Sequence, residues 1–155
     1  MKAKNKRLTI LSELEQFALY DPPDFDEKQR AEFLTFTETE LQLILNRPDP
    51  TTQIYCAIQL GYFKAKQLFF RLSWKQIDEE DIFFIIQNYF HDLTVNKYPI
   101  TKHEYYYQCN IIANLFEYRS WSKKITPLLY QQATQIVKRD ISPRFIALEL
   151  TSYLR

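Results

Sequence analysis

A single glycine, Gly61, occurs among the 155 residues of this chain. Sheet proteins need many tight turns whose backbone favours glycine, and loops that cradle phosphate groups are rich in it. Helices need far fewer glycines. The chain is therefore expected to be all-α, as a compact multi-helix module of about seven or eight helices with helix-turn-helix-like pieces.

The composition favours a folded, intracellular protein. Apolar residues make up 46% of the chain and aromatic residues 16%, which is enough buried surface to offset the entropy of ordering the chain. Two cysteines, Cys56 and Cys109, are too few for a disulfide framework. No signal-peptide pattern and no apolar run of membrane-spanning length is present. We expect a cytoplasmic protein with no membrane partner.

Helix starts are marked along the whole sequence. Three capping boxes place a carboxylate three residues after a hydroxyl: Ser12 with Glu15, Thr37 with Glu40, and Thr101 with Glu104. Three further starts place a capping side chain before a proline: Asp49-Pro50, Thr126-Pro127 and Ser142-Pro143. Asp78 is expected to cap another helix, whose acidic first turn, residues 79–81, suits the positive end of the helix dipole.

Apolar spacing predicts how these helices bury their faces. One helix is expected from Asp49 to about Phe70, with Lys64, Gln67 and Arg71 together on one side. Helix 79–90 is apolar nearly all round and is expected to form the core of the module. Helix 102–116 and two carboxy-terminal helices, 127–139 and 143–154, are expected to be amphipathic. The first of these three is predicted to bury Tyr105, Cys109, Ile112 and Phe116.

The periodicity breaks between His91 and Ile100, at the residues Asn96, Lys97, Tyr98 and Pro99. This break is either a linker or a long turn. We therefore expect two helical subdomains, residues 1–92 and residues 93–155, with the second either separate from the first or packed with it as one unit.

The net charge of +1 conceals an uneven distribution. Residues 1–11 carry four basic groups and no acid, and residues 12–63 carry three basic and ten acidic groups. Residues 64–75 carry four basic groups and no acid, and residues 93–155 carry nine basic and four acidic groups. The three basic segments are candidates for a surface that faces phosphates, although solvated charge explains them equally well.

Several segments together resemble the amino-terminal region of the Tn-three family of transposases. The resemblance spans nearly the whole chain, and its most specific part is the motif at residues 59–67. The segments are Arg7 to Ser12, Ala18 to Tyr20 with Pro23 and Phe25, Phe36 to Leu41, Gln59 to Gln67, Tyr106 to Gln108, Glu117 to Arg119, and Pro143 to Leu150. One departure is Glu117, where the pattern leads us to expect glycine, so the turn there is expected to differ in shape.

The resemblance implies a bacterial module that binds the terminal inverted repeats of a transposon, associated with the nucleoid when bound. The nuclease-like domain of such transposases carries their metal-binding carboxylates, and nothing resembling it occurs before Arg155. The chain is accordingly expected to be an excised domain or a truncated copy. Its expected partners are double-stranded DNA, and the rest of the transposase or a second copy.

Two segments are the main candidates for reading a duplex, because groove contacts need a helix flanked by cations. A loop and an amino-terminal arm, Lys2, Lys4, Lys6 and Arg7, are candidates for backbone and minor-groove contacts. The first of the two main segments contains Lys64, Lys66, Gln67, Arg71 and Lys75. The second is the start of helix 102–116, with Thr101, Lys102, His103 and Tyr106. The loop contains Arg119, Lys123 and Lys124 around Trp121.

Catalysis by this chain alone is not expected. His91 and His103 do not lie at metal-ligand spacing with the cysteines, and no nucleophile motif or pair of catalytic carboxylates stands out. We expect no metal, no cofactor and no small-molecule substrate. The rival interpretation is a helical protein-interaction or dimerisation module, since Tyr and Arg are also enriched at protein interfaces. A free-standing fragment that keeps DNA binding would also compete with the full-length transposase.

Overall fold

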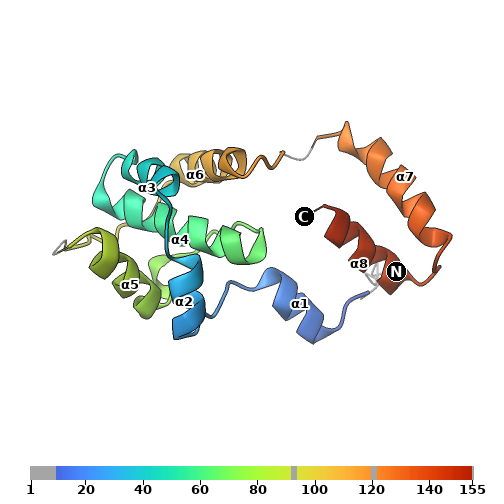
Figure 1. The fold of residues 1–155 in the computed structure, drawn as a ribbon, viewed down its shortest axis with the longest axis horizontal. Helices are drawn as coiled ribbons and strands as arrows, with labels where there is room; N and C mark the ends of the chain where they lie inside the picture. Colours follow the sequence, from blue (N-terminus) through green and yellow to red (C-terminus); the bar gives the residue numbers. More distant parts are fainter. Residues whose placement is uncertain (1–9, 92–93, 120–121, 155) are drawn as a thin grey trace, which may run out of the picture. The chain divides into compact units, whose positions relative to one another are not determined.

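The computed structural model describes residues 10–91, 94–119 and 122–154. In these residues the chain forms eight α-helices, one short 3-10 helix and no strand, which confirms the all-α prediction (Figure 1). The elements are α1 (Glu13–Tyr20), α2 (Glu27–Phe33), α3 (Glu38–Leu45), α4 (Pro50–Lys66), η1 (Trp74–Gln76), α5 (Glu79–Tyr89), α6 (Lys102–Leu115), α7 (Ile125–Val137) and α8 (Pro143–Tyr153).

The helices divide into two compact units. The central unit is Pro22–Arg119, and the terminal unit is Met1–Asp21 with Ser120–Arg155. This division differs from the expected boundary at residues 92 and 93, because α6 packs against α4 and so joins the helices that precede that boundary. In the terminal unit α7 packs against α8, and Arg144 of α8 pairs with Glu15 of α1.

Helix α4 is the core of the central unit. Helices α2, α3, α5 and α6 all pack against it, as Figure 1 shows. Every residue from Thr51 to Phe63 except Gln53 is buried. The sequence instead predicted the helix at 79–90 as the core. That prediction was wrong, because α5 buries only Asp81, Ile82 and Ile85 and leaves the Phe83 side chain 65% exposed.

The glycine of α4 is required by the packing of its neighbours. A Cβ atom at Gly61 would lie 2.3 Å from Cδ2 of Leu34 and 3.2 Å from the Phe33 carbonyl oxygen. Leu34 is fully buried where α2 ends. Gly61 therefore allows the end of α2 to approach the backbone of α4 more closely than any other residue would.

A buried ion pair joins α2 to α5. Arg30 Nε donates to Asp81 Oδ1 at 2.7 Å, and the Tyr62 hydroxyl of α4 donates to Asp81 Oδ2 at 2.8 Å. Arg30 also pairs with Glu80 at 3.1 Å. Burial raises the pKa of Asp81, and the hydrogen bonds from Arg30 and Tyr62 oppose that rise. Part of the acidic turn at 79–81 thus binds Arg30, a role that the helix dipole alone does not predict.

Most predicted helix starts are observed. Both hydrogen bonds of the capping box form at Ser12 and at Thr37, and Asp49, Asp78 and Ser142 cap their helices. At Thr101 only half of the predicted box forms. The Thr101 side chain accepts from Glu104 N at 3.1 Å, but the Glu104 carboxylate turns to Arg47 and accepts from Gln108 Nε2 at 2.9 Å.

Two predicted boundaries were wrong. Helix α4 ends at Lys66, because Gln67 takes a left-handed conformation with φ of 51° and turns the chain before Phe70. Arg71 therefore lies beyond the helix and does not share a face with Lys64. Helix α7 begins at Ile125, two residues before Pro127. Its first-turn amides have no helical acceptor, so proline is tolerated there. Helix α2, capped by Asp26, was not predicted.

Candidate functional site

The loop that follows α4 is anchored to the buried face of that helix. The Tyr55 hydroxyl donates to the Leu72 carbonyl at 2.9 Å, and Gln59 Nε2 donates to the Phe70 carbonyl. Arg71 lies between these two anchored carbonyls and is exposed. Lys75, in η1, is exposed as well. The backbone around both cations is thus fixed, while their side chains reach solvent.

The start of α6 is held against the same region. Trp74 Nε1 donates to the Tyr98 carbonyl at 2.8 Å, and Thr51 Oγ1 donates to the Asn96 carbonyl at 2.7 Å. These bonds fix the segment that leads into the Thr101 cap. Lys102 and the next residue, His103, then stand exposed in the first turn of α6.

The two segments predicted to contact DNA meet through a row of aromatic rings. The Arg71 guanidinium carbon lies 6.0 Å from the centroid of the Tyr105 ring, and Lys102 Nζ lies 5.9 Å from that of Tyr106. The two tyrosine rings are themselves 5.3 Å apart, edge to face. Arg71, from the first segment, is therefore a near neighbour of the second segment, although about thirty residues separate them in sequence.

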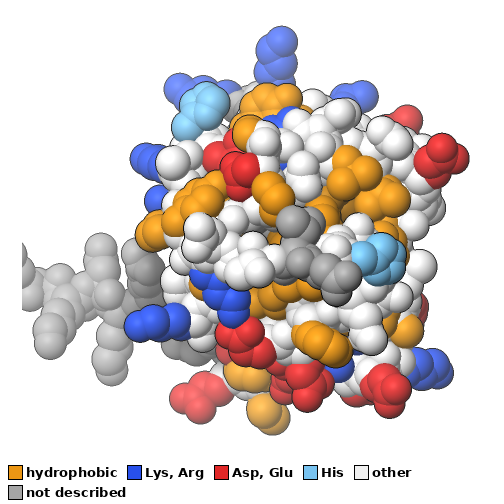
Figure 2. All heavy atoms as spheres, turned by 90° about the vertical axis from the view of Figure 1, so that its left-hand side faces the viewer, with side chains coloured by type: hydrophobic (Ala, Val, Ile, Leu, Met, Phe, Trp, Pro, Cys, Tyr) orange, Lys and Arg blue, Asp and Glu red, His pale blue; other side chains and the backbone are white. Residues whose placement is uncertain are grey.

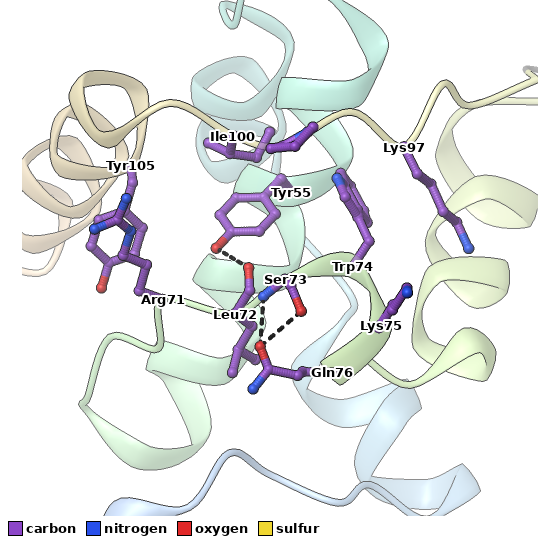
Figure 3. Close-up of a pocket in the computed structure, with 11 residues that line it drawn as sticks. Tyr55, Arg71, Leu72, Ser73, Trp74, Lys75, Gln76, Lys97, Ile100 and Tyr105 are labelled. Atoms are coloured by element: carbon purple, nitrogen blue, oxygen red, sulfur yellow. Dashed lines mark hydrogen bonds between the residues drawn. The ribbon is translucent and has the colours of Figure 1, made fainter.

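A hollow of about 460 Å³ opens between the loop, η1 and the start of α6 (Figure 3). We call it the basic–aromatic hollow. Its walls contain aromatic and aliphatic side chains, three cations and two neutral polar groups. It is lined by Tyr55, Arg71, Leu72, Ser73, Trp74, Lys75, Gln76, Lys97, Pro99, Ile100 and Tyr105. No carboxylate belongs to this set of described residues, so the local charge is positive.

Two of the three cations have no carboxylate partner in the described part of the chain. Lys97 Nζ pairs with Glu79 at 2.6 Å, whereas no ion pair is found for Arg71 or for Lys75. Burial raises the pKa of Tyr105, so its phenol stays protonated at neutral pH. The hollow thus offers two uncompensated cations, neutral hydrogen-bonding groups and ring surfaces.

Positive charge is local on this molecule. Figure 2 shows Lys, Arg, Asp and Glu side chains interspersed with hydrophobic ones on one face, with acidic side chains gathered along its lower edge. A uniformly basic face is not what the picture shows. Attraction of an anion by this face therefore depends on small groups of cations and not on a broad basic surface.

The other predicted residues of the first segment lie elsewhere in the central unit. Lys64 Nζ donates to the Thr35 carbonyl at 2.9 Å and to Glu40 at 3.3 Å, so its charge has partners inside the protein. Lys66 is half-buried, and Gln67 forms the left-handed end of α4. Lys64 and Gln67 line a second hollow, of about 340 Å³, with Glu32, Phe33, Phe63, Phe116 and Tyr118.

The predicted loop after α6 spans the two units. Arg119 is exposed at the end of the central unit, and Lys123 and Lys124 are exposed in the terminal unit, just before α7. Trp121 and the basic arm with Lys2, Lys4, Lys6 and Arg7 lie outside the described residues. Glu117, before Arg119, has a φ of 60° and so takes the left-handed conformation that glycine favours. The turn there keeps a glycine-like shape.

Sequence reasoning missed three residues near the site. Lys97 and Trp74 line the basic–aromatic hollow. Arg47 lies over the exposed Tyr107 ring of α6, with its guanidinium carbon 4.3 Å from the centroid. The break at residues 96–99 was the available signal for Lys97, since it precedes a capped helix. Nothing in the sequence signals that Arg47 reaches Tyr107, because the contact depends on how the turn between α3 and α4 lies against α6.

Neither cysteine is arranged as a nucleophile. Burial raises the pKa of the Cys56 thiol to about 12 and also raises the pKa of Cys109. Within the described residues, no group of three or more His, Cys, Asp or Glu side chains is arranged to hold a metal ion. In that same part of the chain no helix is long and apolar enough to cross a membrane.

The fold and the hollow together define a class: an all-α protein whose central unit carries a basic, aromatic-lined surface hollow. The chain belongs to the family described as "Domain of unknown function (DUF4158)", whose model matches residues 10–155. No curated protein and no solved structure matches the chain.

Proposed function

We propose that this chain is a DNA-binding module of a Tn-three-type transposase, recognises the terminal inverted repeats of a transposon and performs no chemistry itself. The sequence resemblance supports the assignment to this family of transposases. One observation supports DNA as the partner. Arg71, Lys75 and the start of α6 line one hollow, and the described lining of that hollow contains no carboxylate.

The arrangement suits a duplex in two respects. Lys102 and His103 are exposed at the amino-terminal end of α6, where the helix dipole also favours a phosphate. Arg71 is exposed beside that helix end, and Lys75 is exposed on the opposite side of the same hollow. Cations from two separate segments can therefore contact one backbone, while exposed Tyr106 offers a ring and a hydroxyl to the groove.

The test is binding of the purified chain to duplexes that carry the terminal repeat and to scrambled duplexes, across a salt series. Preference for the repeat is the expected result. Arg71→Ala and Lys102→Ala should each weaken binding and reduce the salt slope by about 0.9, the value for one released phosphate contact. Lys28→Ala is the matched control, because Lys28 is an exposed lysine of α2 away from the hollow. An unchanged slope in both variants would remove Arg71 and Lys102 from the interface.

A second candidate function is a protein-interaction module, and exposed apolar side chains of the terminal unit favour it. Leu14 and Phe17 of α1 are 83% and 66% exposed, and Tyr130 of α7 is 72% exposed. Large exposed apolar side chains on a small unit are typical of docking surfaces. Sedimentation distinguishes this candidate from the first. A docking module should self-associate in the Arg71→Ala variant as it does unmodified, and should lose self-association in the double variant Leu14→Ser with Phe17→Ser.

A further inference from the structure

The basic–aromatic hollow is larger than contacts with a nucleic-acid backbone require. Phosphates of a duplex run along its outer surface and are reached by exposed side chains. A cavity of about 460 Å³ lies instead in the range of pockets that enclose a small molecule. The hollow therefore has room for a group that leaves the nucleic-acid backbone and enters the protein.

The walls are suited to a flat apolar group. Leu72, Pro99 and Ile100 contribute aliphatic surface to the hollow. The Trp74 and Tyr105 rings, 8% and 7% exposed, and the Tyr55 ring, 1% exposed, add only small parts of their surface, and Figure 3 shows these three rings with Leu72 and Ile100. Tyr55 and Trp74 are held by hydrogen bonds to the Leu72 and Tyr98 carbonyls, so these rings do not need to be ordered when a ligand enters. Proteins that hold an unpaired base stack it between aromatic and other apolar side chains.

The charged groups stand on opposite sides of this apolar wall. In Figure 3 Arg71 lies on one side of Tyr55 and Leu72, and Lys75 and Lys97 lie on the other. Because Lys97 is paired with Glu79, Arg71 and Lys75 are the cations available to phosphates. Ser73 and Gln76 add neutral hydrogen-bonding groups between them. A base with a phosphate on either side matches this order of groups.

We propose that the hollow binds one unpaired nucleotide of a DNA strand, with its base against the apolar wall and its flanking phosphates at Arg71 and Lys75. This inference rests on the proposed function in that it takes DNA as the partner. It adds that the module holds a base outside the duplex, at a frayed or distorted end. Unpaired bases are available for such stacking, whereas bases within a duplex are not.

Trp74 provides the readout. The chain has two tryptophans, so Trp121→Phe leaves Trp74, in the wall of the hollow, as the only indole emitter. This variant of the full chain is titrated with a short oligothymidylate, with thymidine monophosphate, with inorganic phosphate and with a polyglutamate peptide. Saturable quenching by the oligothymidylate, at concentrations where the other three probes have no effect, is the expected result.

Gln76→Glu tests the hollow without disturbing its fold. Gln76 Oε1 accepts from Ser73 N and from Ser73 Oγ, both at 2.9 Å, and a glutamate oxygen accepts the same two bonds. The substitution therefore adds only a negative charge to the lining. It should weaken oligothymidylate binding about fivefold or more, and Lys75→Ala should weaken it to a similar degree. Lys28→Ala, outside the hollow, should leave it unchanged.

The outcomes separate this inference from the proposed function. Repeat-specific duplex binding without oligothymidylate quenching overturns the nucleotide site and leaves the DNA module standing. A second outcome is quenching by the oligothymidylate that Gln76→Glu weakens, together with equal binding of repeat and scrambled duplexes. That outcome supports the nucleotide site and contradicts recognition of the transposon end. Equal quenching by thymidine monophosphate or inorganic phosphate, or quenching by the peptide alone, overturns the proposal in favour of a free-anion or protein site.

Discussion

Arg30 is the cation that pairs with the fully buried carboxylate of Asp81 in the central unit. Its guanidinium lies between the fully buried carboxylate of Asp81 and the exposed one of Glu80. Arg30→Ala would leave Asp81 as an unpaired charge in the core. We expect this substitution to lower the free energy of unfolding by about 3–5 kcal/mol.

The measurement is urea unfolding followed by circular dichroism. The control is Glu79→Ala, which breaks the exposed pair between Glu79 and Lys97 and should cost at most about 1 kcal/mol. Equal losses in the two variants would show that burial of Asp81 does not decide the effect.

Glu117 carries backbone strain where α6 ends. Its N–H donates to the Asn114 carbonyl at 3.1 Å, and Tyr118 N–H donates to the Ala113 carbonyl at 2.8 Å, which is the Schellman pattern. This pattern places Glu117 in the left-handed region, with φ of 60°. Only glycine occupies that region without steric cost.

Glu117→Gly should therefore raise the free energy of unfolding by about 0.5–1 kcal/mol, measured by urea unfolding. Glu32→Gly within α2 makes the same chemical change at a helical position and should lower stability by about 1 kcal/mol. Loss of stability in both variants would mean that the strain at Glu117 is relieved by contacts of its side chain.

Among the helices, the starts could be predicted from sequence and the packing order could not. A cap is a local event, in which one side chain bonds to an amide three residues on, so Ser12, Thr37 and Asp49 could be read directly. Whether a helix is central depends on how many partners surround it. Helix α5 has the more apolar sequence, yet α4 is enclosed because four helices pack against it, and its glycine allows one of them, α2, to end close to its backbone.

The capping box of α1 should respond to pH. Hydrogen bonds from the Ser12 backbone and hydroxyl, and then the contact with Arg144, lower the pKa of Glu15 from 4.5 to about 2. A lowered pKa in the folded state stabilises the fold above the unfolded value, and this stabilisation is lost as pH falls. The contribution of Glu15 should therefore disappear between about pH 4.5 and pH 2.

An NMR titration of the Glu15 carboxyl carbon measures this pKa. Ser12→Ala removes the hydrogen bond from the Ser12 hydroxyl, and Arg144→Ala removes the contact with α8, so each variant should raise this pKa. Both variants keep the bond from the Ser12 backbone amide, so the pKa should stay below 4.5 in each. An unchanged pKa in Ser12→Ala would show that the cap hydroxyl does not stabilise the carboxylate.

For the molecule as a whole, the candidate site could be predicted in part. The sequence indicated that Arg71, Lys75, Thr101 and Lys102 belong to basic segments, and the structure brings Arg71 close to the start of α6 and places Lys75 in the lining of the same hollow. The sequence did not indicate that Lys64 donates to the Thr35 carbonyl and to Glu40, because these contacts need α3 to lie against α4. Contacts between distant segments require the fold, whereas charge runs do not.

The central unit should fold without the terminal unit. Its hydrophobic core cluster lies entirely within residues 22–119, whereas Ile136 is the one buried hydrophobic residue described outside that range. We expect a fragment of residues 22–119 to unfold cooperatively in urea, with the change in Trp74 fluorescence that the full chain shows. A fragment that melts without a cooperative transition would show that the core needs α7 and α8.

The hydrogen bond from Gln108 bears on how the chain emerges from a ribosome. Gln108 Nε2 donates to the Thr52 carbonyl at 3.1 Å, across 56 residues of sequence, and the Gln108 side chain is fully buried. During synthesis, α4 is made before α6, the last of the helices that pack against it. The face of α4 that α6 covers therefore stays exposed until α6 has left the ribosomal exit tunnel. A nascent chain stalled before α6 has left the tunnel would thus expose to chaperones the face of α4 that α6 covers.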